Sequence, residues 1–183
     1  DINALFFLAN LYLFGENVQK DINKSIQYFS IAAYQNDMYS QYSLFLIYFN
    51  GFDVKRNVLK GIDFLIQSSK NDFKLAHFSL GFLYFEGKYI PQDIKKSISL
   101  YKEASNVDVS YAKNNLGVIY RNGFKSIIQK NISVSIEYFE EAINKSKDIV
   151  SLFNLAHIYI YEDTIKHDFD KAIKLLIESS KQY

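Results

Sequence analysis

The sequence predicts an all-α protein, a right-handed superhelix (α-solenoid) of about five helical pairs. The first observation is repetition: a leucine recurs every 36 residues, at Leu8, Leu44, Leu80 and Leu116, and a tyrosine follows each leucine by four positions. The second is the helical period, because a small residue, the leucine and the tyrosine, each four apart, share one stripe of a helix. The third is composition, since 7 glycines and 1 proline are too few for the turns of a many-stranded barrel or sandwich.

The repeated units cover residues 2–37, 38–73, 74–109, 110–147 and 148–183, and they predict a single repeat domain over 1–183. Each unit predicts two helices. A glycine three positions after the tyrosine ends the first helix, since glycine adopts the left-handed conformation at little cost; these glycines are Gly15, Gly51, Gly87 and Gly123. An aspartate or asparagine then caps the second helix, at Asp21, Asn57, Asp93, Asn131 and Asp168.

A few positions depart from the usual rules for helix ends or from the repeat pattern. A positive charge stands in the first turn of the second helix, against the helix macrodipole, at Lys24, Lys60, Lys96 and Lys171. Val134 replaces this lysine in the fourth unit, and Glu162 replaces the glycine in the fifth. Phe45 stands where the other units have glycine or alanine, so we expect a local change of packing in the second unit.

The first helices are apolar on two sides, as expected of helices that lie between neighbours in a stack. One side consists of Ala4, Leu8, Leu11, Tyr12 and their equivalents, and we expect it to be core. The other side carries an aromatic column, formed by Phe6, Tyr42, Phe78 and Phe153. We expect this column to pack in the core rather than to stack on the bases of a nucleic acid.

Composition and spacing exclude several classes of function. The chain has no cysteine, which removes disulfides, thiolate metal sites and cysteine nucleophiles. Its formal net charge of +1 argues against a nucleic-acid partner, and its longest apolar stretch, residues 4–14, is too short to span a membrane. Of the 3 histidines, His77 lies in the third unit, and His157 and His167 lie ten residues apart in the fifth, without metal-binding spacing; no glycine-rich phosphate loop is present. We therefore expect no enzyme, no cofactor and no bound metal.

A third side of the first helices varies in chemistry from unit to unit, and in a solenoid it lines the concave surface. Variable side chains on a fixed backbone are typical of a recognition groove. We therefore predict that a protein or peptide partner lies along this side, at Leu46, Asn50, Phe82, Glu86, Val118, Asn122 and His157. Phe82 is the expected apolar anchor, because aromatic residues dominate the energetics of interfaces. The alternative is that these residues form an ordinary solvated face.

The first unit differs on this side, because Phe7 and Phe14 replace mostly polar counterparts. A terminal repeat that caps a stack is polar on its outer face. We therefore expect one of two arrangements: either the chain is a fragment of a longer array, or it self-associates through the Phe7/Phe14 edge.

The combined motif is small-x3-Leu-Gly/Ala-x2-Tyr-x2-Gly, followed by Asp-x2-Lys-Ala/Ser-Ile, and it is clearest from Ala76 to Lys96. It resembles the Sel-one-like repeat (SLR), a relative of the tetratricopeptide repeat, over roughly residues 2–182. The resemblance implies a non-catalytic scaffold or adaptor for protein–protein interaction.

The resemblance also implies a more specific role, in an endoplasmic-reticulum-associated degradation ubiquitin-ligase complex. Ligase components and misfolded glycoproteins would then be the partners, and the endoplasmic-reticulum lumen the compartment. Three N-x-S sequons, at Asn23, Asn131 and Asn144, are compatible with a luminal protein. The alternative is a cytosolic or secreted SLR signalling scaffold with a different protein partner.

Overall fold

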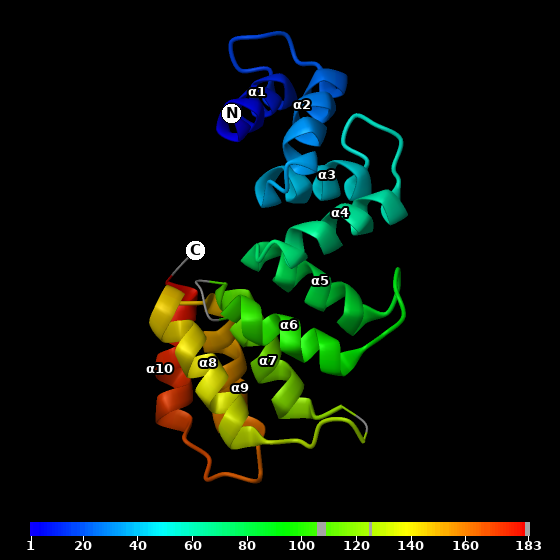
Figure 1. Ribbon diagram of the computed structural model, residues 1–183. Coiled ribbons are helices and arrows are strands. Elements are labelled where there is room, and N and C mark those ends of the chain that lie inside the picture. Colours follow the sequence, from blue (N-terminus) through cyan, green and yellow to red (C-terminus); the bar gives the residue numbers. More distant parts are fainter. Residues whose placement is uncertain (106–108, 125, 182–183) are drawn as a thin grey trace. The chain divides into compact units, whose positions relative to one another are not determined.

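The computed structural model describes residues 1–105, 109–124 and 126–181, and it folds them into ten α-helices (Figure 1). The helices are α1 (Ile2–Phe14), α2 (Ile22–Tyr34), α3 (Met38–Asn50), α4 (Val58–Lys70), α5 (Lys74–Glu86), α6 (Ile94–Ser105), α7 (Ser110–Asn122), α8 (Ile132–Ser146), α9 (Ile149–Tyr161) and α10 (Phe169–Ser180). The only β-type pairing in these residues is an isolated bridge between Phe124 and Ile128. The predicted fold class, an all-α helical repeat, is confirmed.

The chain divides into two compact units, Asp1–Gln92 and Asp93–Tyr183, and each is described by itself. The first unit holds the helical pairs α1/α2 and α3/α4 together with α5, and the second holds α6 with the pairs α7/α8 and α9/α10. Within each pair the two helices lie side by side and run in opposite directions (Figure 1). The predicted boundary between the third and fourth repeats lies between residues 109 and 110; residues 106–108, at the end of the third repeat, lie outside the described residues.

Helix ends follow the predicted capping residues. The side chains of Asp21, Asn57, Asn131 and Asp168 each accept a hydrogen bond from the backbone N–H three residues later, at 2.9–3.1 Å. The backbone N–H of each of these caps donates to the carbonyl of the repeat tyrosine on the preceding helix, at 2.8–3.1 Å. At Gly15, Gly51 and Gly87 the backbone is left-handed, with φ between 68° and 78°. These four repeats therefore close their own loops with local hydrogen bonds.

The structure explains why lysine stands in the first turn of the second helices. In three repeats its ammonium lies over the ring of the repeat tyrosine: Lys24 over Tyr12 at 4.9 Å, Lys60 over Tyr48 at 4.1 Å and Lys171 over Tyr159 at 4.5 Å. Lys60 and Lys171 also donate to the tyrosine hydroxyl, at 2.8 and 2.6 Å. A cation–π contact contributes about 0.5–1 kcal/mol at exposed sites, which offsets the small macrodipole cost.

Large and small side chains are matched across the helical pairs. In α7, Gly117 lies against the fully buried ring of Phe139 in α8, and a β-carbon at Gly117 would fall 2.6 Å from that ring. In the second repeat Phe45 occupies the position of Gly117, and the smaller Leu65 occupies the position of Phe139. Gly61 of α4 supplies further room, since a β-carbon there would lie 2.9 Å from a backbone nitrogen of α3. The packing of the second repeat therefore differs locally, as the sequence predicts.

Two core predictions are wrong. Ala4 and Leu8 of α1 are exposed, whereas their equivalents Ser40 and Leu44 are fully buried. The reason is that no described helix packs on that side of α1, while α3 has α2 beside it. In the aromatic column, Phe6 packs against Phe29, with ring centroids 5.7 Å apart, but Phe153 is 55% exposed.

Candidate functional site

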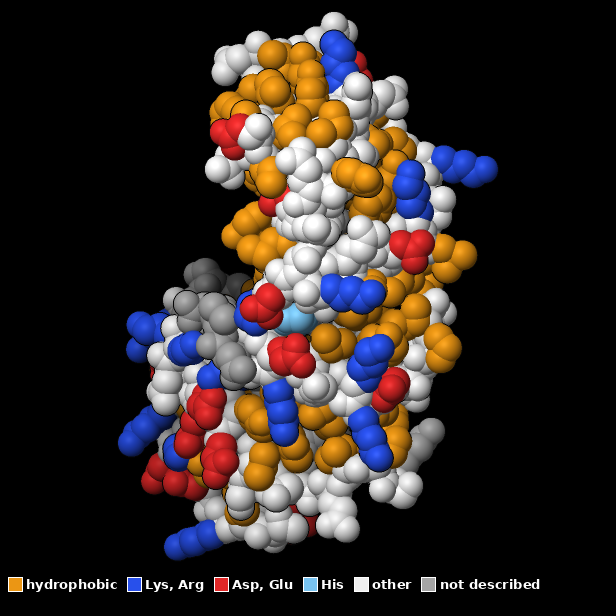
Figure 2. Space-filling view, in the orientation of Figure 1, with side chains coloured by type: hydrophobic (Ala, Val, Ile, Leu, Met, Phe, Trp, Pro, Cys, Tyr) orange, Lys and Arg blue, Asp and Glu red, His pale blue; other side chains and the backbone are white. Residues whose placement is uncertain are grey.

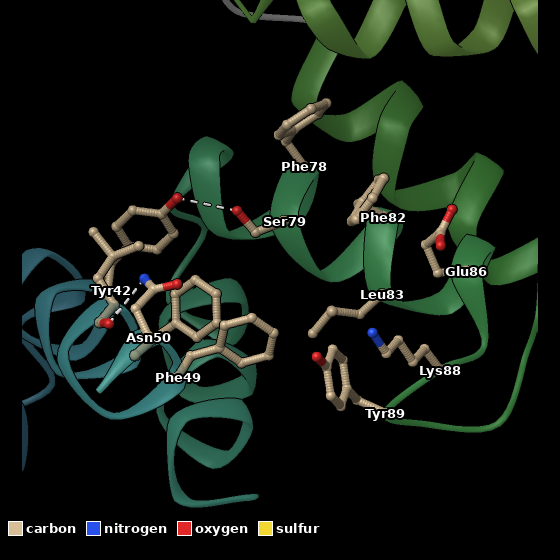
Figure 3. A pocket seen from close by; sticks show the side chains of 12 residues that line it. Tyr42, Phe49, Asn50, Phe78, Ser79, Phe82, Leu83, Glu86, Lys88 and Tyr89 are labelled. Carbon is tan, nitrogen blue, oxygen red and sulfur yellow. Dashed lines mark hydrogen bonds between the residues drawn. The ribbon is translucent and has the colours of Figure 1, made fainter. Parts of the chain in front are cut away.

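The first unit contains an apolar pocket between α3 and α5, called here the α3–α5 groove (Figure 3). Its volume is about 380 Å³, within the range of pockets that hold ligands or partner side chains. The lining residues are Tyr42, Phe45, Leu46, Phe49, Asn50, Phe78, Ser79, Phe82, Leu83, Glu86, Lys88 and Tyr89. The structure thus brings four of the predicted groove residues together around one pocket: Leu46, Asn50, Phe82 and Glu86.

Helical spacing puts these four residues on two facing stripes. Leu46 and Asn50 are four apart on α3, and Phe82 and Glu86 are four apart on α5, so each pair lies on one helix face. Leu46 is 36% exposed and Phe82 is 46% exposed, while Asn50 and Glu86 lie at the solvent-exposed rim. Figure 3 shows Phe82 between Phe78 and Glu86 along α5. The groove therefore offers two accessible apolar side chains with polar groups beside them.

The loop after α5 closes one end of the groove. The Tyr89 ring meets Phe49 edge-on, with centroids 5.2 Å apart. Arg56 links Tyr89 to α3, because its Nε donates to the backbone carbonyl of Phe49 at 2.7 Å and its Nη2 donates to the Tyr89 hydroxyl at 3.0 Å. That hydrogen bond lowers the pKa of Tyr89 from its ordinary value. A wall fixed in this way loses little freedom when a partner binds.

A second depression adjoins the groove on the same unit. It has a volume of about 360 Å³ and is lined by α1, α3 and the loops that follow them: Asn10, Leu13, Phe14, Lys20, Ser43, Leu46, Ile47, Phe52 and Asp53. Leu46 belongs to both depressions. Lys20 and Asp53 form an ion pair of 2.6 Å at the rim, with both side chains about half exposed. An exposed pair of this kind contributes little to stability.

The other predicted residues lie in the second unit. Asn122 and His157 line a polar pocket of about 330 Å³, together with Arg121, Lys130, Ile158, Tyr161 and Glu162. Val118 lies outside this lining and packs against the buried cluster of Ile132, Phe139, Leu155 and Ile158. The hydrogen bond from Lys130 lowers the pKa of Glu162 from its ordinary value, and the ion pair between them measures 2.9 Å. This pocket differs in chemistry from the apolar groove of the first unit.

A serine, a histidine and a carboxylate lie in line between α4 and α5. A carboxylate can only accept, so Nε2 of His77 donates to Asp72, at 3.0 Å, and Nδ1 shares a hydrogen bond of 2.8 Å with the Ser69 hydroxyl. Lys74 also binds Asp72, and these two hydrogen bonds lower the pKa of that carboxyl. Hydrolases use the same order of groups, but with an accessible serine and free backbone donors for the oxyanion.

Here Ser69 and His77 are buried, and the N–H groups of Asn71, Asp72 and Phe73 donate to carbonyls of the last turn of α4. The cluster therefore fastens α4 to α5. Among the described residues, no group of three histidine, aspartate or glutamate side chains is placed to hold a metal ion.

Sequence reasoning missed several groove residues. It assigned Tyr42 and Phe78 to the core, but they are only partly buried and form the groove walls together with Phe49. It also omitted Lys88 and Tyr89, because they follow Gly87 in a loop where helical spacing gives no information. One available signal was Arg56, since arginine is scarce in this chain and is the residue best suited to fix an aromatic loop residue.

The surface of the first unit is rich in exposed apolar side chains. In Figure 2 they cover much of the area over α1 to α3, whereas acidic and basic side chains gather over α8 and α10. Phe7 and Phe14 of α1 are 65% and 66% exposed. None of the described helices combines the length and the apolar character needed to cross a membrane.

Comparison with known proteins identifies the repeat. The family model for the Sel1 repeat matches residues 2–37, 39–73, 74–107, 110–147 and 149–183. No curated protein matches the sequence at a significant level.

Three solved structures share the fold. A Sel1 repeat protein from Oxalobacter formigenes is 21% identical with a TM-score of 0.87, and the alignment covers 99% of this chain and 73% of that one. A protective antigen of uropathogenic Escherichia coli with an SLR fold is 22% identical with a TM-score of 0.90, covering 99% and 38%. A putative Sel1 repeat protein from Klebsiella pneumoniae is 18% identical with a TM-score of 0.59, covering 99% and 86%. At these identities the likeness concerns the fold alone.

Proposed function

Since the chain belongs to the Sel1 repeat family, we propose that it is a non-catalytic scaffold that binds a segment of a partner protein in the α3–α5 groove. Sel1 repeat proteins are in general scaffolds for protein–protein interaction. The observation that carries the proposal is the apolar pocket between α3 and α5, with Leu46 and Phe82 accessible at its mouth.

The groove has the anatomy of a small interaction site. Aromatic and aliphatic walls exclude water, while Asn50 and Glu86 stand at the rim, as polar groups do around an interface core. Burial of one apolar side chain of the partner against Phe82 and Leu46 contributes about 1.5–3 kcal/mol. The adjoining depression on α1 and α3 extends the apolar surface through the shared Leu46.

In the second unit, Asn122 and His157 are proposed as a further contact region of polar character. Arg121 and Lys130 line the same pocket, and the side chain of Arg121 lies 3.4 Å from Asn154. Val118, on the same helix as Asn122, packs against the buried cluster and so fixes the position of that helix. We propose a non-catalytic role because Ser69 and His77, which resemble part of a hydrolase site, are buried in a contact between α4 and α5.

A narrower form of the proposal places the chain in an endoplasmic-reticulum-associated degradation ubiquitin-ligase complex, with misfolded glycoproteins among its partners. Its support is the family resemblance, together with three sequons compatible with the lumen. A cytosolic or secreted scaffold with another protein partner remains the alternative. Self-association through the exposed Phe7/Phe14 edge also stays a prediction, to be measured by sedimentation of a Phe7→Ser, Phe14→Ser variant.

The test of the scaffold function is affinity capture from cells of the source organism, with the chain and three variants as baits. Leu46→Ala and Phe82→Ala should each lose a common set of captured proteins. Leu59→Ala is the matched control, because it makes the same change at a 71% exposed leucine on α4 of the same unit. Equal capture by all four baits contradicts the groove. If ubiquitin-ligase and lectin components are among the proteins that require an intact groove for capture, they support the role in the ligase complex. If they are absent, that role is refuted.

A further inference from the structure

Three charged side chains lie around the α3–α5 groove, and they differ in the contacts that they make within the protein. The Lys88 ammonium lies over the Tyr89 ring, 5.2 Å from its centroid. Arg56 is held by the Phe49 carbonyl and the Tyr89 hydroxyl. In the described part of the chain, by contrast, the Glu86 carboxylate has neither an ion pair nor a hydrogen bond. An unengaged negative charge therefore stands at the rim beside Phe82.

The amide of Asn50 adds an acceptor on the opposite stripe. Its Nδ2 donates to the carbonyl of Leu46, one turn earlier on α3, at 3.0 Å (Figure 3). A carbonyl can only accept, so the amide nitrogen is the atom bound to the helix, and Oδ1 is left as an acceptor beside the second N–H of Nδ2. Asn10 does the same in the adjoining depression, where its Nδ2 donates to the Phe6 carbonyl at 2.8 Å. Both depressions therefore present an amide oxygen as acceptor.

The walls of the groove also suit a cation that has an apolar stem. Phe82 is accessible, and Phe49 and Phe78 contribute partly buried rings. A lysine or arginine side chain lays its methylene groups along such rings while its charged head stays at the polar rim. The faces of aromatic rings attract the head as well.

From these contacts we infer that the α3–α5 groove selects a peptide segment in which a lysine or arginine stands beside an apolar residue. The apolar side chain enters the pocket against Leu46 and Phe82, and the cation meets the Glu86 carboxylate, with the Asn50 amide oxygen as a second acceptor. This inference rests on the proposed function, since it names the chemistry of the partner that the groove binds.

The experiment is a selection of random peptides displayed on phage, panned against the whole chain. Selected peptides are then synthesised, and their dissociation constants are measured by fluorescence anisotropy. We expect lysine or arginine next to an apolar residue in the selected sequences. Glu86→Gln should weaken binding roughly two- to fivefold, the effect of one exposed ion pair. Asp63→Lys, which reverses an exposed charge on α4 of the same unit, should leave binding unchanged.

A charge exchange makes the assignment specific. A peptide with its basic residue changed to glutamate should bind the wild-type chain more weakly, and Glu86→Lys should recover that binding. Circular dichroism of each variant checks that the fold is intact. Selected peptides that are neutral or acidic overturn the inference. So does an unchanged affinity of Glu86→Lys for the basic peptide.

The groove as a binding site and its preference for a cation can be refuted separately. If Phe82→Ala abolishes binding but the charge exchange has no effect, the groove stands and its preference for a cation does not. If no peptide is selected, or if Phe82→Ala binds as well as the wild type, the proposed function fails and the inference fails with it.

Discussion

The contact between Gly117 and Phe139 allows a quantitative test of the packing. Changing Gly117 to alanine raises the intrinsic helix propensity of α7 by about 1 kcal/mol. The new methyl group, however, would lie 2.6–2.9 Å from three atoms of the Phe139 ring. That ring is fully buried, so it cannot swing into solvent, and overpacking of this kind costs about 1–3 kcal/mol. We expect a net loss of about 1 kcal/mol.

A double-mutant cycle assigns the loss to this contact. Phe139→Leu removes the edge of the ring, as Leu65 does opposite Phe45 in the second repeat. In the double variant the two changes should compensate by about 1 kcal/mol relative to their sum. The assay is urea unfolding followed by circular dichroism. Asn115→Ala on the same helix controls for helix propensity. The packing described here is refuted if Gly117→Ala raises the free energy of unfolding by the full amount of about 1 kcal/mol expected from helix propensity, and if the effects of the two substitutions simply add in the double variant.

Three further variants test other contacts by the same assay. Val134→Lys should restore the lysine-on-tyrosine contact missing from the fourth repeat and raise stability by about 0.5 kcal/mol, whereas Val134→Met should not. His77→Ala leaves the Ser69 hydroxyl buried without its partner and should cost about 1–3 kcal/mol; no loss would contradict the contact. The hydrogen bond from Lys130 lowers the pKa of Glu162 below 4.5, so its stabilising effect is present above that pH and is lost on acidification. The difference in unfolding free energy between wild type and Glu162→Gln should therefore shrink below pH 4.5, and a constant difference would contradict the ion pair.

The sequence predicts those features of the fold that depend on local chemistry. The capping of α2 by Asp21 and the left-handed Gly15 at the end of α1 each involve residues only a few positions apart. Such interactions leave a pattern that recurs in every repeat. For the same reason, the sequence predicts the number and order of the helices.

Features that depend on distant contacts could not be predicted in this way. The first-turn lysines contradict a local rule, and only the position of Lys60 over Tyr48 on another helix resolves the conflict. Leu8 follows the same pattern as Leu44, yet it is exposed because the pattern does not say which helices lie beside it. In the candidate site, helical spacing predicts the positions of Leu46 and Phe82. The position of Tyr89 could not be predicted, because it depends on how the loop after α5 folds back against Phe49.

The matched volumes across the helical pairs affect how such a chain can evolve by duplication and exchange of its parts. The repeats share one order of helix, loop and helix, but a single helix cannot be exchanged between them, since α4 in place of α8 would set Leu65 opposite Gly117 and leave a void. Exchange of a whole hairpin keeps each large side chain with its small partner. The hairpin, and not the single helix, is therefore the unit that can be exchanged, and viable chimaeras should have their junctions in the turns that follow α2 and α8.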